Sequence, residues 1–177
     1  PFPEQRRRLR LGVVGGGRIA QTQAMAARMT GRWDVVAGAL SSDPMRSKER
    51  ANLWHIDEAR AYHDFDEMVE KELKRSDRVD AVMITTPNNM HYPAAKVFLE
   101  SGIDVICDKP LAAHLADTEG LSELVKEQDR LFAVTYNYSG YPLIRHAREI
   151  IASGELGKIR VVQAEYPQDW LSEKLED

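Results

Sequence analysis

Short apolar runs alternate with amphipathic helical patterns along almost the whole of this 177-residue chain. Several runs, such as "AVMIT" at residues 81–85, are continuously apolar, as expected for strands that helices cover on both faces. Strands that alternate with helices form βαβ units and pair in parallel. We therefore predict an α/β fold with a doubly wound parallel sheet. The expected strands are residues 9–14, 34–40, 79–85, 103–107 and 131–135, with a weaker one near 61–63.

Helical spacing and glycine stops predict three of the helices. Residues 93–101 carry one apolar face and are followed by Gly102, a residue typical of the position just after a helix. Apolar residues recur three and four apart around residues 121–125, and again over residues 143–151 before Gly154.

Composition and charge favour a soluble globular protein without a nucleic-acid partner, since 43% of residues are hydrophobic and the net charge is -4. The basic run "RRRLR" at residues 6–10 is interpreted as a solvated lead-in, because the "LGVVGGG" that follows is too short for an export signal. No apolar run approaches the ~20 residues of a membrane helix. A single cysteine, Cys107, excludes an internal disulfide and a cysteine-based metal cluster. We expect no metal site, no membrane contact and a cytoplasmic location.

The first predicted strand runs directly into "GGGRIA", residues 15–20, which fits the pattern G-x-G-x-x-A. In this pattern Gly15 permits a tight turn, Gly17 lets the backbone approach a pyrophosphate, and Ala20 allows the helix to pack close to the sheet. The N-terminus of that helix offers free N–H groups to phosphates. The motif therefore predicts a dinucleotide-binding Rossmann unit. The alternative is a glycine-rich turn that serves packing alone.

The end of the second predicted strand bears on the choice between NAD and NADP. NAD-binding units usually place an acid there, about 20 residues after the glycines, whereas this chain has Ser41 and Ser42. Hydroxyls could bind a 2′-phosphate, with Arg18 and Arg46 as its counter-charge. The cofactor is thus NAD or NADP, with a slight preference for NADP. Alternatively, the Ser-Asp-Pro sequence is only a helix cap and first turn.

Polar side chains follow three predicted strands at their carboxyl ends, in "TTPNNMH" (85–91), "CDKP" (107–110) and "TYNY" (135–138). In an open α/β sheet, ligands bind outside these ends. Asn88 is either a ligand contact or a helix cap, and His91 either a cofactor contact or a packing residue. Asn137 and Tyr138 are either site residues or turn and core residues. Lys109 is the strongest candidate for chemistry, provided that the cleft binds a cofactor.

The motifs "GVVGGGRIA", "TTPNNMH", "DKPLA" and "ASGELGKIRVVQAEY", in this order, resemble the N-terminal region of the Gfo/Idh/MocA oxidoreductases. The resemblance implies that Gly15, Gly17, Arg18 and Ile19 contact the pyrophosphate, Ser41 and Ser42 the adenosine ribose, and Thr86, Pro87, Asn88 and His91 the path to the nicotinamide. Asp108, Lys109 and Pro110 correspond to the family's Glu-Lys-Pro signature, with Asp in place of Glu. Lys109 is then the catalytic residue. We also count Asp108, Lys109 and Pro110, and from its position after the last predicted strand Asn137, among the cofactor-binding residues.

The resemblance also implies a domain organisation and a reaction. Residues 1–137 would form the NAD(P)-binding domain, and residues 138–177 would start a second α/β domain that carries the substrate pocket and the homo-oligomer interface. The run "KIRVVQAEY" is interpreted as the first strand of that domain rather than an edge strand of the first sheet. The substrate would be a sugar or cyclitol, and an Asp and a His that partner the lysine would lie beyond Asp177. A non-catalytic dinucleotide sensor or assembly module remains an alternative. So does another Rossmann dehydrogenase, which would not predict Asp-Lys-Pro.

Overall fold

The computed structural model describes residues 7–169. It contains two compact units, divided between Tyr136 and Asn137. The first unit holds the sheet and its helices, and the second a short helical segment.

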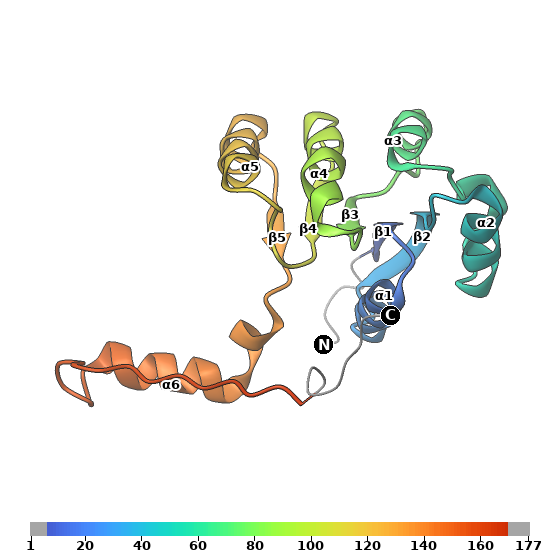
Figure 1. The fold of residues 1–177 in the computed structure, drawn as a ribbon. Helices are drawn as coiled ribbons and strands as arrows, with labels where there is room; N and C mark the ends of the chain where they lie inside the picture. The colour runs from blue at the N-terminus through green and yellow to red at the C-terminus, as the bar shows by residue number, and fades with distance from the viewer. Residues whose placement is uncertain (1–6, 170–177) are drawn as a thin grey trace, which may run out of the picture. The chain divides into compact units, whose positions relative to one another are not determined.

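Within the described part of the first unit, the five strands all pair in parallel in the order β2-β1-β3-β4-β5 (Figure 1). Their bounds are β1 Leu9–Val14, β2 Trp33–Ala39, β3 Ala81–Ile84, β4 Asp104–Cys107 and β5 Phe132–Val134. This confirms the predicted doubly wound α/β fold. The weak strand near 61–63 is reduced to one bridge between Gly38 and Ala61, because a 3-10 turn, η1 (Glu58–Arg60), ends just before it and Asp64 caps the next helix just after it.

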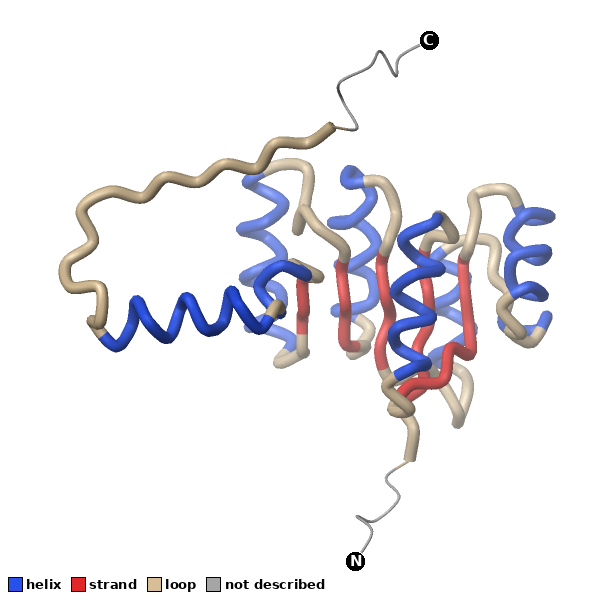
Figure 2. Tube along the Cα trace, turned by 90° about the horizontal axis from the view of Figure 1, so that it is seen from below, coloured by secondary structure: helices blue, strands red, loops and turns tan. Residues whose placement is uncertain are grey.

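Helices cover both faces of the sheet. One face packs against α1 (Arg18–Met29) and α2 (Pro44–Leu53). The other packs against α3 (Phe65–Leu73), α4 (His91–Glu100) and α5 (Leu115–Gln128), which stand side by side in Figure 1. In the view from below, α1 lies in front of the strands (Figure 2). Burial of all of β3, and of β1 from Leu11 to Val14, between these two layers explains why these stretches lack polar alternation.

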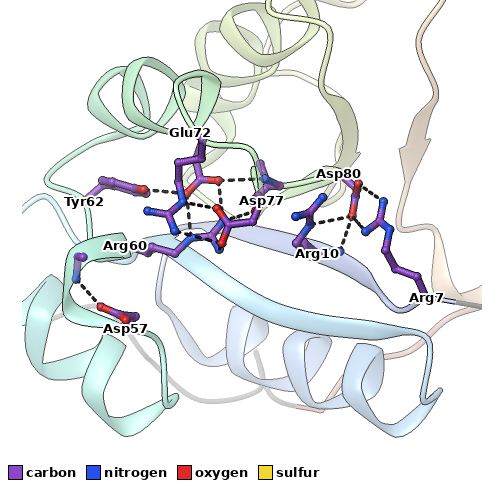
Figure 3. Close-up of polar contacts among 11 residues, drawn as sticks. Arg7, Arg10, Asp57, Arg60, Tyr62, Glu72, Asp77 and Asp80 are labelled. Carbon is purple, nitrogen blue, oxygen red and sulfur yellow. Dashed lines mark hydrogen bonds and ion pairs between the residues drawn. The ribbon is translucent and has the colours of Figure 1, made fainter.

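The amino ends of β1 and β3 are joined by ion pairs to Asp80 (Figure 3). The Arg7 guanidinium donates to both Asp80 oxygens at 2.7 and 2.8 Å, and the Arg10 backbone N–H donates at 2.7 Å. These donors, Arg7 foremost, hold the pKa of Asp80 well below its usual range. Arg8 pairs with Asp34 at 3.1 Å. Arg7 and Arg8 are exposed, as a solvated lead-in predicts, and in addition they form these ion pairs. Arg6 lies outside the described residues.

A buried polar cluster lies beside these pairs, where η1 and α3 meet the start of β3 (Figure 3). Glu72 has no exposed surface and binds Arg60 in a bidentate pair, through Nε at 3.0 Å and Nη2 at 2.6 Å. Its oxygens also accept from the Tyr62 hydroxyl at 2.7 Å and the Val79 N–H at 2.9 Å. Burial and the neighbouring carboxylate raise the pKa of Tyr62. One carboxylate thus joins three chain segments: α3, residues 60–62 and the start of β3.

The second unit consists of η3 (Asn137–Gly140), α6 (Pro142–Ser153) and an irregular stretch. The predicted helix over 143–151 is confirmed, and it stops at Gly154, whose φ of +78° favours glycine. The strand predicted over residues 158–166 is wrong: the described residues of this segment form no regular element. An alternating pattern makes a strand only where a neighbour accepts its hydrogen bonds.

Candidate functional site

The order of the strands reverses between β1 and β3. From β1 the chain moves to β2 on one side and then returns to β3 on the other. Ligands of open α/β sheets bind at such a point, outside the carboxyl ends of the strands. Here these ends carry Gly15 and Thr85, which lie in contact: the Thr85 hydroxyl lies 3.1 Å from the Val14 carbonyl oxygen and 3.4 Å from that of Gly15.

Three glycines shape the turn between β1 and α1. Gly15 has φ +95°, and a Cβ there would come within 2.9 Å of the Thr85 backbone. A Cβ on Gly16 would come within 2.2 Å of the Leu40 carbonyl oxygen. A Cβ on Gly17 would meet no atom of residues 7–169 within 4 Å. Gly15 and Gly16 are therefore required by the fold, whereas the space beside Gly17 is open for a ligand.

Sequence reasoning assigned no task to Gly16, the middle position of the motif. Its constraint comes from β2, through the Leu40 carbonyl. Ala20 is fully buried against the sheet, as predicted for a small residue at that position.

The N-terminus of α1 suits an anion. Gly17 is its N-cap, and among the described residues no side chain caps the first turn. The side chains of Arg18 and Ile19 are exposed. Uncapped N–H groups and the positive end of the helix dipole bind phosphate oxygens. The turn thus fits the pyrophosphate of a dinucleotide, by its donors and by the room at Gly17.

Of the polar residues that follow β2, one caps the next helix and others are exposed to solvent. Asp43 accepts from the Arg46 N–H at 3.1 Å and so caps α2, as the alternative interpretation of Ser-Asp-Pro expected. Ser41 accepts from the Asp43 N–H at 3.2 Å, and Ser42 is exposed. The side chain of Arg46 is exposed. Arg50, which sequence reasoning missed, donates to the Leu40 carbonyl at 2.8 Å.

The loop after β3 holds Thr86, Pro87 and Asn88. Asn88 is exposed and caps neither η2 (Asn88–Met90) nor α4 with its side chain. The Thr86 hydroxyl is buried without a hydrogen-bond partner in the described part of the chain. A buried donor without a partner is unusual in a native structure. The loop therefore offers one unsatisfied hydroxyl and one exposed amide.

The His91 ring links two loops of the candidate site. Its side chain is buried, with Nδ1 2.7 Å from the Pro110 carbonyl and Nε2 3.0 Å from the Thr86 carbonyl. Both ring nitrogens are thereby occupied by backbone oxygens. This geometry fits the alternative of a packing residue, because the ring joins the loop after β3 to the turn after β4; a contact between His91 and a cofactor stays a prediction.

The turn after β4 presents Lys109. Its side chain is exposed and forms no ion pair with any acid in residues 7–169. The peptide bond to Pro110 is cis. The preceding Asp108 carboxylate accepts from the Thr135 hydroxyl at 2.7 Å and from the Gln23 amide at 3.1 Å. Asp108 is thus held from two sides, while the Lys109 ammonium remains available.

Gln23 and Thr135 had not been selected from the sequence. Thr135 lies within the "TYNY" motif, but Gln23 carries no local signal, since only the packing of α1 brings it to β4. The Gln23 Oε1 atom is buried and, within the described residues, has no partner.

Cys107 lies in the core of the first unit, and Asn137 lies in the second unit. Cys107 is fully buried, and burial, aided by the charge of Asp108, raises the pKa of its thiol to about 12, so it is a neutral core residue. Asn137 belongs to the second unit, where its amide donates to the Tyr141 hydroxyl at 3.4 Å, and its cofactor role stays a prediction. Over residues 7–169, no group of acids, histidines and cysteines could hold a metal, and no helix could cross a membrane.

Comparison with known proteins gives the same picture. The first unit matches a family model described as "Oxidoreductase family, NAD-binding Rossmann fold" over residues 9–136. An oxidoreductase from Sinorhizobium meliloti is 49% identical, with a TM-score of 0.90 over 94% of this chain and 47% of its own. An inositol dehydrogenase homolog from Azotobacter vinelandii, solved with NAD+, is 38% identical, with a TM-score of 0.84 over 87% of this chain and 40% of its own.

A curated relative, the D-xylose 1-dehydrogenase [NADP(+)] of Haloarcula marismortui, is 28% identical over 85% of this chain and 41% of its own length. The chain therefore spans less than half the length of these relatives. Since the family model matches well over half of the chain, on a sheet whose glycine turn lies at the strand reversal, the chain belongs to the Gfo/Idh/MocA oxidoreductase family.

Proposed function

We propose that this chain is the cofactor-binding part of an NAD(P)-dependent oxidoreductase that moves a hydride between the nicotinamide and a sugar or cyclitol carbon. The glycine turn carries the proposal: α1 has no side-chain cap among the described residues, and the space beside Gly17 is open. Gly15, Gly17, Arg18 and Ile19 would hold the pyrophosphate. The names of the relatives, an inositol dehydrogenase homolog and a xylose dehydrogenase, support the substrate class.

The bound nicotinamide supplies the hydride chemistry, and the protein manages the substrate's proton. Lys109 would donate a hydrogen bond from Nζ to the reacting oxygen. That ammonium has no competing acid in residues 7–169. Thr86, Pro87 and Asn88, in the loop after β3, would line the path of the cofactor toward the nicotinamide. We further propose that the domain beginning near residue 138 carries the substrate pocket and the oligomer contacts.

Thr135 is proposed to position Lys109 through Asp108. Its hydroxyl donates to the Asp108 carboxylate at 2.7 Å, and its backbone N–H donates to the Cys107 carbonyl at 3.0 Å. The residue that follows β5 therefore fixes the turn that follows β4. Replacing Thr135 with valine removes the hydroxyl at nearly constant shape. We expect kcat to fall about tenfold, since a misplaced catalytic group loses rate rapidly, and cofactor affinity to stay within about twofold.

Serine at the same position is the matched control, because Thr135→Ser keeps the donor. It should restore most of the kcat lost in Thr135→Val. Equal kcat values for wild type and Thr135→Val, measured by steady-state kinetics, would remove Thr135 from the positioning of Lys109.

The proposed function is tested with the complete gene product and a panel of sugars and cyclitols, by following the absorbance of reduced cofactor. Turnover with at least one polyol and either NAD+ or NADP+ is expected. Saturable cofactor binding without turnover on the whole panel would instead favour a dinucleotide sensor or assembly module.

A further inference from the structure

We propose that Arg50 binds the 2′-phosphate of NADP and gives the site its preference for NADP over NAD. This proposal rests on the proposed function, because it assigns a residue to one end of the same cofactor. Arg50 is proposed in addition to Arg18 and Arg46, which the sequence suggested as counter-charges. The side chains of both are exposed. Arg50 differs from both because the structure fixes it at the end of β2.

The guanidinium of Arg50 lies between the glycine turn and the first residue after β2. Its Nη1 donates to the Leu40 carbonyl at 2.8 Å. A Cβ on Gly16 would come within 2.9 Å of Arg50 Cδ and 3.0 Å of Nη1. The end of β2 beside the glycine turn is where this fold binds the adenosine ribose. Arg50 therefore reaches the part of the site that distinguishes the two cofactors.

The charge of Arg50 is not neutralised by the protein. One of its five N–H donors is used by Leu40. Within residues 7–169, no carboxylate lies within ion-pair distance of it. The nearby Asp43 uses its carboxylate to cap α2. A half-buried guanidinium with spare donors and no acid is suited to a phosphate, which it binds through several N–H groups at once.

The end of β2 lacks the carboxylate that an NAD site of this fold would need. An NAD site of this fold puts a carboxylate at the end of β2 to accept from the ribose hydroxyls, whereas an arginine nearby accommodates the 2′-phosphate. Here Ser41 and Ser42 occupy that position. Donors without an acid favour the phosphorylated ribose.

The helix that carries Arg50 is anchored to the end of β2. The hydroxyl of Ser47, which is buried, accepts from the Leu40 N–H at 3.0 Å and donates to the Tyr62 carbonyl at 2.9 Å. Leu40 is therefore held by α2 at both its N–H and its carbonyl. A cation on such a fixed support loses little freedom when it binds an anion.

The test compares Arg50→Gln with wild type in titrations of the complete gene product with NADP+, NAD+ and 2′,5′-ADP, by isothermal calorimetry. Glutamine keeps a donor for the Leu40 carbonyl and removes the charge. We expect NADP+ and 2′,5′-ADP to bind at least about tenfold more weakly, and NAD+ affinity to change by less than about twofold. Lys48→Gln removes a charge from the same helix, where Lys48 pairs with Glu58 at 3.1 Å, and should leave all three affinities unchanged.

Equal weakening of NADP+ and NAD+ in Arg50→Gln would overturn the proposal and leave Arg50 a structural link between α2 and β2. Wild-type affinity for NAD+ equal to or above that for NADP+ would also overturn it. A second variant, Arg50→Lys, keeps the charge without the planar fork and should retain part of the NADP+ preference. Absence of binding by both dinucleotides would instead overturn the proposed function, and this proposal with it.

Discussion

Replacing Lys109 with alanine in the complete gene product is expected to lower kcat at least about a hundredfold, the low end of general acid–base contributions. Lys109 lies at the carboxyl end of β4, exposed and without an ion-pair partner in residues 7–169. The turn that carries it is fixed by other groups, namely the Asp108 carboxylate and the His91 ring. Loss of the ammonium should therefore remove the proton donor and leave the backbone in place.

Cofactor affinity should change by less than about twofold in Lys109→Ala, because the proposed pyrophosphate and ribose contacts come from other residues. Lys96→Ala is the matched control: Lys96 is on α4, beside Glu100 at 3.9 Å, and its loss should leave kcat unaltered. The comparison uses steady-state kinetics with the polyol that gives the fastest turnover. A kcat within about threefold of wild type would exclude Lys109 from the chemistry.

Replacing Glu72 with alanine is expected to lower the free energy of unfolding by about 3–5 kcal/mol, as is usual when one partner of a buried ion pair is removed. The change removes the acceptor of the Tyr62 hydroxyl and the Val79 N–H, and leaves the Arg60 guanidinium only its longer contacts with Asp77, at 3.3 and 3.6 Å. Arg60 is itself buried, so water cannot readily replace the carboxylate. Urea unfolding followed by circular dichroism measures the effect.

Glu70 provides the control from the same helix. It is exposed and, among residues 7–169, forms an ion pair with Lys74 one turn later, so Glu70→Ala should leave the free energy of unfolding nearly unchanged. A loss below about 1 kcal/mol in Glu72→Ala would show that the cluster is not the structural link described here.

The sequence allowed the fold to be predicted where local pattern and tertiary surroundings agree. A continuous apolar run marked β3 because both faces of the sheet are covered there, and Gly15 was identifiable because its turn is local. The strand over 158–166 was predicted from alternation alone, which contains no information on whether a neighbour is present. The "RRRLR" run gave no sign of Asp80, which lies some seventy residues away in the chain.

The sequence predicted which residues of the candidate site lie at the ends of strands. It predicted less well which atoms those residues contact. Lys109 and the glycine turn follow from position in the sheet. His91 could be predicted from the sequence only as either a cofactor contact or a packing residue, because its burial between two carbonyls depends on α4 beginning at His91 itself. Gln23, Arg50 and Gly16 were missed because each contacts a residue far away in the sequence. Gln23 contacts Asp108 after β4, and the other two lie against the Leu40 carbonyl after β2.

The central claim is that the glycine turn binds the pyrophosphate of a dinucleotide, and Gly17→Asp tests it most directly. Gly17 has φ -73°, ordinary for any residue, and its Cβ position is open with respect to all described atoms. Aspartate is a good N-cap, so the thermal midpoint of unfolding should stay level or rise. Its charge would occupy the anion's place, so calorimetric affinity for NADP+ and NAD+ should fall at least about tenfold. Unaltered affinity in a folded Gly17→Asp variant would contradict the account.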